Sequence, residues 1–252
     1  MVKLLLKKSY LRKNLKEVSF RDLWNSFGIF TTMRVIGESP KIFLYKEHIN
    51  NLVKSLKIYN LYQSNIRQNI NYLVKNSLKK KIKYDHLLRV ACNKNFISIS
   101  LRRRLKPHKN FYLRLLKHKR VDPQLKNLKY GKILKELGKY DATKNDLVLC
   151  YKNQILETGT SNLFLIKKNE IFSPYKNFYK GVTYKYFNKS IKIKNKNIFI
   201  NKMDEYSEIL LIGSGKGVTS VSAIPSINWK RKNKKMYIKL NKIYKRALRK
   251  LN

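Results

Sequence analysis

Four short apolar runs between residues 146 and 174 place the strongest constraint on the fold. They read DLVLCYK, QILE, NLFLIKK and EIFSP, and only a few residues separate one run from the next. Asn153 and the pair Lys168–Asn169, which stand between runs, are residues that tight turns favour. Short strand-like runs joined by tight turns predict consecutive hairpins, and they exclude a simple succession of βαβ units.

The N-terminal part of the chain predicts a separate α/β domain. Residues 27–46 read as two strands around a Gly-Glu-Ser-Pro turn, residues 48–61 as a helix, and residues 86–103 as a hairpin. Residues 106–124 carry two prolines and many charges, which favours a connection between domains. We therefore expect a small domain at 1–105, followed by this connection.

The remaining residues, 125–252, predict a larger domain that contains the hairpins. Apolar residues at helical spacing predict helices at 125–140 and 235–250, and a short helix at 181–190. The stretch EILLIGSGKGVTSVSAI predicts a strand, a glycine loop and a second strand. The expected fold class is α/β of the α+β type, in two domains.

The charge of the chain is its most conspicuous compositional feature. It has 58 lysines and arginines against 14 acidic residues, a formal net charge of +44. Such a surface attracts nucleic acids. However, 45 of the basic residues are lysines spread along the whole chain, together with many asparagines, isoleucines and tyrosines. We interpret this as a coding bias on a solvated surface, and we expect no specific nucleic-acid partner.

Several functional classes find no support in the sequence. Cys92 and Cys150 lie inside apolar runs, which favours buried free thiols. The four histidines are scattered, so we expect no metal site. No apolar run approaches the ~20 residues that span a membrane, and the N-terminal apolar run is too short for a signal peptide. A cytoplasmic protein is expected.

The glycine loop in LLIGSGKGVTS is not a nucleotide-binding P-loop. That motif needs a glycine five positions before the glycine of Gly-Lys-Ser/Thr, but Leu210 stands there and Gly217 follows Lys216. Exposed backbone N–H groups of such a loop still suit a phosphate monoester. The same applies to Gly181-Val182-Thr183 at the start of a predicted helix.

Four motifs follow one another in the second half: LKNLK, ETGTSNLF, KGVT and IGSGKGVTSV. Their order and spacing resemble the class IV aminotransferase family, the fold-type IV pyridoxal-phosphate enzymes. The resemblance spans roughly residues 25–250. It implies pyridoxal 5'-phosphate as cofactor, held between a small N-terminal α/β domain and a larger domain with a β-barrel-like sheet. It also implies a homodimer and an amino substrate that carries a carboxylate.

The resemblance assigns roles to residues of the motifs. Lys126, which opens the helix predicted at 125–140, would hold the cofactor as a Schiff base and act as general base and acid; Lys129 is the rival. Lysine performs this chemistry when its pocket is desolvated and cationic. Glu157 would pair with the pyridine nitrogen of the cofactor and keep the ring an electron acceptor. The phosphate would be bound by Val182, Thr183, Gly213 and Ser214, and Arg120 is a candidate for a basic residue near the cofactor.

Two departures from the family pattern concern binding of charged groups. Family members usually carry a phosphate-binding arginine where HINNL places Asn51, and asparagine lacks the charge and the bidentate geometry of arginine. Lys54 is a nearby substitute. The substrate loop is shortened to Asn93-Lys94-Asn95, which leaves Lys94 and Arg102 as candidates for binding the substrate carboxylate.

The stretch FTTMRV at 30–35 bears on the reaction. Its Phe30, Thr31, Thr32, Arg34 and Val35 resemble 4-amino-4-deoxychorismate lyases of the family, which expel pyruvate and form 4-aminobenzoate for folate synthesis. Phe30 and Thr31 are therefore candidate substrate contacts. A branched-chain or D-amino acid transaminase is the alternative. An alternative of another class is a basic binding protein that keeps the fold without the cofactor.

Overall fold

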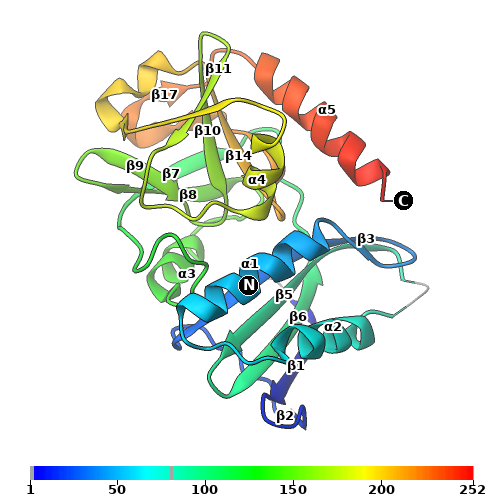
Figure 1. Ribbon diagram of the computed structural model, residues 1–252. Coiled ribbons are helices and arrows are strands. Elements are labelled where there is room, and N and C mark those ends of the chain that lie inside the picture. The colour runs from blue at the N-terminus through cyan, green and yellow to red at the C-terminus, as the bar shows by residue number, and fades with distance from the viewer. Residues whose placement is uncertain (1–2, 80–81, 252) are drawn as a thin grey trace. The chain divides into compact units, whose positions relative to one another are not determined.

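The computed structural model describes residues 3–79 and 82–251, and the chain forms two compact units. Unit 1 comprises Met1–Arg104, Leu125–Gly131 and Leu251–Asn252, and unit 2 comprises Leu105–Gln124 and Lys132–Lys250. The chain therefore leaves unit 1 after residue 104, returns to it at 125–131 and leaves it again. Figure 1 shows the elements of both units in sequence colours.

Unit 1 is an antiparallel sheet packed against two helices. The strand order is β2-β1-β6-β5-β3-β4, and every described pair is antiparallel. The hairpin predicted across residues 93–95 and the strands around the Gly-Glu-Ser-Pro turn are confirmed. The elements are β1 (Leu4–Leu11), β2 (Glu17–Val18), β3 (Gly28–Gly37), β4 (Lys41–Ile42), α1 (Tyr45–Ile58), α2 (Ile66–Ser77), β5 (Tyr84–Asn93) and β6 (Phe96–Arg103).

The core of unit 1 lies between one face of this sheet and the two helices. Helix α1 buries Ile49, Leu52 and Leu56, which share one face because they are three or four residues apart. They pack against alternate residues of the strands, such as Met33 on β3 and Leu88 on β5. Full burial of each such side chain stabilises the fold by about 1.5–3 kcal/mol.

Unit 2 contains two sheets that share a core. One has the order β12-β11-β10-β14-β15 and the other β13-β9-β8-β7-β16-β17. Apolar residues of both sheets, among them Leu113, Val148 and Leu211, form that core. The strands are β7 (Tyr112–Lys117), β8 (Asn145–Tyr151), β9 (Gln154–Thr158), β10 (Asn162–Lys167), β11 (Glu170–Pro174), β12 (Ile193–Lys196), β13 (Ile198–Phe199), β14 (Glu208–Gly213), β15 (Gly217–Ser220), β16 (Ala223–Ile224) and β17 (Trp229–Lys230).

The predicted hairpins of unit 2 are confirmed in their turn geometry. Strands β8 and β9 are joined by Lys152 and Asn153, with φ of 47° and 60°, and β10 and β11 by Lys168 and Asn169, with φ of 48° and 63°. Two consecutive residues with positive φ make a type I′ turn, whose twist matches that of the flanking strands. Asparagine tolerates this conformation better than most residues.

Three α-helices belong wholly or mainly to unit 2. They are α3 (Gly131–Leu137), α4 (Val182–Asn188) and α5 (Lys235–Arg249), and two short 3-10 helices lie at Ile200–Glu205 and Pro225–Ile227. Helix α5 begins against a buried acid: the amides of Met236 and Tyr237 donate to the two carboxylate oxygens of Glu208 at 2.8 and 2.9 Å. The predicted helices at 181–190 and 235–250 are confirmed.

The helix predicted over residues 125–140 is wrong in its first half. The helix begins only at Gly131, and residues 125–130 form an extended segment along β3. Asn127 makes an isolated bridge with Ile29, and Phe30 N–H donates to Lys126 O at 2.9 Å. These long-range backbone bonds override the helical spacing of the apolar residues. The stretch 106–124, expected to be a connection, contains β7 and groups with unit 2.

Cys92 and Cys150 are both buried free thiols, as their apolar surroundings in the sequence predict. Burial raises the pKa of the Cys92 thiol to about 12. Among residues 3–79 and 82–251, no group of three or more potential metal ligands is found. No helix in the same range is long and apolar enough to cross a membrane.

Candidate functional site

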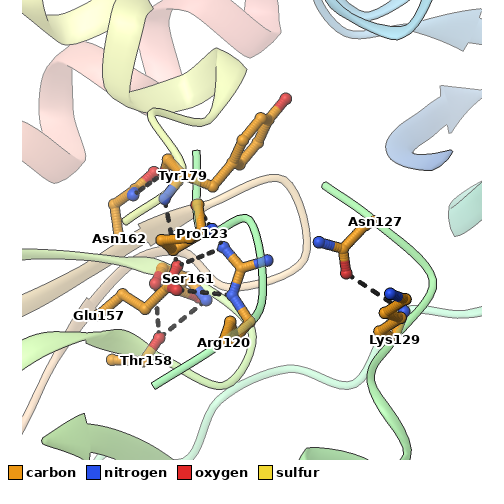
Figure 2. Close-up of polar contacts among 9 residues, drawn as sticks. All are labelled: Arg120, Pro123, Asn127, Lys129, Glu157, Thr158, Ser161, Asn162 and Tyr179. Carbon is orange, nitrogen blue, oxygen red and sulfur yellow. Dashed lines mark hydrogen bonds and ion pairs between the residues drawn. The ribbon is translucent and has the colours of Figure 1, made fainter. Parts of the chain in front are cut away.

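A buried ion pair lies at the end of β9. Glu157 is 4% exposed and Arg120 3% exposed. Arg120 Nε donates to Glu157 Oε1 at 2.6 Å and Nη2 donates to Oε2 at 3.0 Å. Tyr179 N–H donates to Oε2 at 3.3 Å, and Arg120 Nη2 also donates to Pro123 O at 2.7 Å. Figure 2 shows the guanidinium facing the carboxylate in this bidentate arrangement, which fixes both side chains.

The loop after Glu157 is held by its own side chains. Thr158 Oγ1 donates to Ser161 O at 2.6 Å and accepts from Ser161 N–H at 2.8 Å. The loop is therefore a compact turn between β9 and β10, and Ser161 and Asn162 leave it in fixed directions. Their hydrogen bonds give them a structural role, which is to connect this loop with the segments around it.

Asn162 ties β10 to the segment before α4. Its Nδ2 donates to Tyr179 O at 2.5 Å, and its Oδ1 accepts from Gly181 N–H at 3.0 Å. A Cβ atom on Gly181 would lie 2.8 Å from Asn162 Oδ1, so only glycine allows this approach. The start of α4 is thereby fixed relative to Glu157, because Tyr179 contacts both Asn162 and Glu157 (Figure 2).

The first turn of α4 has polar groups for which the described residues supply no hydrogen-bond partner. No side chain caps the helix, whose first backbone N–H groups have no intrahelical acceptor. Thr183 is 2% exposed, and its Oγ1 has no hydrogen-bond partner among the described residues. A buried hydroxyl without a partner costs free energy. The turn is therefore suited to an acceptor that is not part of the chain, and Val182 and Thr183 stand where the sequence predicts a phosphate contact.

The glycine loop between β14 and β15 begins beside the loop that follows Glu157. Gly213 pairs with Gly217 across the turn, and Thr219 Oγ1 donates to Lys216 O at 2.8 Å. A Cβ on Gly213 would lie 3.2 Å from Ser161 Oγ, which places the start of this loop against the loop after Glu157. Asn162 and Ile212 are also paired across β10 and β14. Unit 2 thus brings Arg120, Glu157, the start of α4 and the Gly213–Ser214 loop into one neighbourhood.

Lys126 lies in unit 1, on the segment that runs along β3. Its side chain is half-buried, and its ammonium lies 4.7 Å from the centre of the Phe30 ring. Lys129 is exposed, and its ammonium lies 6.0 Å from the Phe27 ring. Asn127 Oδ1 accepts from Lys129 N–H at 3.2 Å (Figure 2). This bond turns the chain between the two lysines. Of the two candidates, Lys126 has the more desolvated environment.

Beside Lys126, β3 and α1 share a buried hydrogen bond. Thr31 Oγ1 and His48 Nδ1 are 2.8 Å apart. Burial, and secondarily the charge of Lys126, lower the pKa of His48 to about 3. The Thr31 hydroxyl therefore serves the contact with α1. Phe30 points to the other face of the sheet, where it packs edge-on against Trp24 and Tyr130.

The remaining substrate candidates lie on β5 and β6 of unit 1. Lys94 is exposed in the turn between these strands. Arg102 is half-buried on β6, and burial and the charge of Arg89 lower its pKa. Arg89 is bound to the Asp22 carboxylate and stacks over Trp24, with its guanidinium carbon 4.2 Å from the ring centre. Asn51 is half-buried on α1, and Lys54 is exposed on the same helix.

Sequence reasoning missed Tyr179, His48, Asp146 and Arg89. Tyr179 acts through its backbone, which no residue-type pattern reveals. The others had a weak signal: each is a polar or charged residue inside or next to an apolar run, such as Asp146 in NDLVLC. In a chain with 14 acidic residues, an acid at the start of a buried strand suggests a defined partner.

A comparison with protein families identifies the family of the chain. The profile of the family described as amino-transferase class IV matches residues 28–224. A comparison with curated proteins gave no match. Many solved structures are similar, and three of them, all below 25% identity, support the fold.

The first is the branched-chain aminotransferase of Thermoproteus uzoniensis with norvaline, with 17% identity, coverage of 96% of this chain and 95% of that one, and a TM-score of 0.78. The second is a putative 4-amino-4-deoxychorismate lyase of Legionella pneumophila, with 17% identity, 87% and 91% coverage, and a TM-score of 0.71. The third is an aminotransferase of Brucella abortus bound to PLP, with 16% identity, 98% and 99% coverage, and a TM-score of 0.73. The chain therefore belongs to the class IV aminotransferases, a family of pyridoxal-phosphate enzymes, as the order of its motifs predicts.

Proposed function

We propose that the chain binds pyridoxal 5'-phosphate and acts with it on an amino substrate that carries a carboxylate. The observation that carries this proposal is the buried Glu157, held in place by Arg120. A buried carboxylate fixed by a bidentate guanidinium and a backbone N–H is suited to face a protonated ring nitrogen.

The residues of unit 2 fit such a cofactor. The Thr183 hydroxyl is buried and lacks a partner among the described residues, and no side chain caps the first turn of α4. Phosphate oxygens accept hydrogen bonds from such groups. Val182 and Thr183 at this turn, with Gly213 and Ser214 in the neighbouring loop, are therefore the residues that we propose hold the phosphate.

The cofactor supplies an electron sink for the charge that forms on the substrate carbon. Glu157 accepts a hydrogen bond at its carboxylate, and Arg120 keeps that carboxylate charged and oriented. Lys126 holds and moves a proton at its Nζ, since its half-buried position beside the Phe30 ring removes part of its water. His48, whose pKa is lowered to about 3, is neutral at physiological pH and adds no second charge beside this lysine.

Covalent trapping of the cofactor tests whether Lys126 is the lysine that binds it. We expect the protein with added pyridoxal phosphate to absorb visible light, and borohydride to fix the cofactor covalently on the peptide that contains Lys126. Lys126→Ala should abolish this adduct, and the matched variant Lys129→Ala should keep it. A wild-type protein that takes up no cofactor would favour a basic binding protein on this fold, and an adduct in Lys126→Ala would reject the choice of lysine.

For the reaction, we propose a 4-amino-4-deoxychorismate lyase, because FTTMRV resembles the lyases at Phe30, Thr31, Thr32, Arg34 and Val35. The similar lyase structure from Legionella pneumophila supports this. A branched-chain or D-amino acid transaminase is the second candidate, supported by the similar aminotransferase from Thermoproteus uzoniensis. Release of 4-aminobenzoate without a keto-acid acceptor identifies the lyase. A strict requirement for an acceptor identifies a transaminase.

We also propose that the enzyme is a cytoplasmic homodimer, as the family resemblance implies. Sedimentation velocity on the purified protein tests the oligomeric state. A monomer at micromolar concentration and moderate salt would contradict it.

A further inference from the structure

Asp146 is a buried carboxylate that the proposed mechanism does not use. It lies on β8, is 1% exposed, and accepts the Thr160 hydroxyl at Oδ2 and the Leu147 N–H at Oδ1, the latter at 2.8 Å. A Cβ atom on Gly159 would lie 3.1 Å from Asp146 Oδ1. Asp146 therefore fixes two residues of the loop that follows Glu157.

Lys216 in the glycine loop is the cation whose charge acts on Asp146. Burial raises the pKa of Asp146, and attraction to Lys216 and the hydrogen bonds of Thr160 and Leu147 oppose this rise. The Lys216 ammonium donates to Ala142 O at 2.9 Å and lies 4.4 Å from the centre of the Phe111 ring. Lys216 is therefore turned toward the segment before β8, where it anchors the glycine loop.

The two loops that Asp146 reaches are in contact with each other. Ser161 of the first lies against Gly213 of the second. The first loop follows Glu157 directly, and the second contains Gly213 and Ser214. One buried carboxylate thus holds the first loop through its hydrogen bond with Thr160, and the first loop contacts the second where Ser161 lies against Gly213.

We propose that Asp146 is a positioning residue, which fixes the loop at 158–161 through Thr160 and, through the contact of Ser161 with Gly213, the start of the glycine loop at 213–217. Its effect on cofactor binding rests on the function proposed above. Its effect on the shape of the loops does not. A buried carboxylate is costly unless its oxygens are hydrogen-bonded, so its bond with Thr160 selects one arrangement of the loop at 158–161.

The experiment compares Asp146→Asn, Thr160→Val and Lys216→Met with matched controls. Asp204 is a suitable control, because it is exposed and lies on the 3-10 helix at Ile200–Glu205. Asp204→Asn and the exposed Lys168→Met, in the turn between β10 and β11, therefore change similar groups outside both loops and outside the segment before β8. Hydrogen exchange of the backbone amides, measured without cofactor, reports the order of each loop.

We expect Asp146→Asn to speed exchange in both loops and to weaken binding of pyridoxal phosphate by about tenfold. Lys216→Met should speed exchange at 213–217 but not at 158–161, because its ammonium holds the glycine loop to Ala142 O. The control variants should match the wild type. If Asp146→Asn leaves exchange at 158–161 or at 213–217 unchanged, the proposal is wrong.

The two proposals fail in different ways. A wild-type protein without affinity for pyridoxal phosphate contradicts the proposed function, and the exchange experiment still decides the role of Asp146. If Asp146→Asn does not fold, Thr160→Val decides it, because it removes the hydrogen bond to Asp146: exchange at 158–161 and at 213–217 must become faster while exchange in β8 stays slow. Equal exchange in Thr160→Val and the wild type would overturn the proposal.

Discussion

At the scale of single residues, Arg120 and Glu157 form the most deeply buried ion pair among the described residues. Their separation by 37 positions in the chain means that the pair exists only in the folded unit 2. Removal of either partner of such a buried ion pair destabilises the fold strongly, because it leaves the other charge uncompensated and away from water.

Replacement of Arg120 tests how much the buried Arg120–Glu157 pair contributes to stability. We expect Arg120→Met to lower the free energy of unfolding by about 3–5 kcal/mol, since Glu157 remains buried without its cation. The double variant Arg120→Met with Glu157→Gln should recover part of the loss. Urea denaturation followed by circular dichroism measures it. The surface pair Lys139–Glu136 is the control, and Lys139→Met should change stability little. Equal losses for the two methionine variants would contradict the buried pair.

His48 predicts a pH dependence of stability. Its folded pKa of about 3 lies below its ordinary value of 6.5, so the unfolded state binds more protons between these values. Its contribution to stability is therefore fully present above pH 6.5 and is lost as the pH falls toward 3. The loss is at most about 1.4 kcal/mol per pH unit. His48→Gln should reduce this slope in urea titrations at several pH values, and His108→Gln, at an exposed position, should not.

The residues of the site differ in how well their sequence context predicts them. Glu157 and Asn162 stand in a short motif between two strands, so their roles could be inferred from local order. His48 and Asp146 acquire their roles from residues 17 and 14 positions away. Such partners are fixed by the register of strands and helices, which residue types alone do not determine.

At the scale of elements, short turns were predictable and the segment of Lys126 was not. The turns at 152–153 and 168–169 depend on two residues each, and asparagine at the second position favours the observed φ. The segment 125–130 has helical apolar spacing, but its backbone bonds go to β3. A long-range partner decided its conformation, and Lys126 is thereby placed beside Phe30.

Helix α5 offers a prediction at this scale. Glu208 is 1% exposed and accepts the amides of Met236 and Tyr237 at the first turn. We expect Glu208→Ala to lower the free energy of unfolding by about 1–3 kcal/mol, because it leaves these amides without an acceptor and removes a negative charge from the positive end of the helix. Thermal unfolding measures it. Glu205→Ala, which removes an exposed acid paired with Lys167, is the control and should have little effect.

At the scale of the whole molecule, the net charge of +44 opposes both folding and association. Salt shortens the range of this repulsion, to about 10 Å at 0.1 M and about 3 Å at 1 M. We expect the melting temperature to rise with sodium chloride over this range, as followed by differential scanning fluorimetry. A melting temperature that falls or stays constant would show that repulsion does not limit stability.

The segment 125–131 has a consequence for how the protein is made. The backbone of Ile29 and Phe30 on β3 pairs with that of Lys126 and Asn127. Residues 105–124, which belong to the other unit, lie between these two segments in the chain. A ribosome delivers the chain from its N-terminus, so β3 emerges long before the strip that covers its edge. Unit 1 therefore cannot complete its fold until residues 105–131 have been synthesised, although residues 105–124 belong to unit 2. A nascent chain stopped at residue 105 would expose this part of the β3 edge.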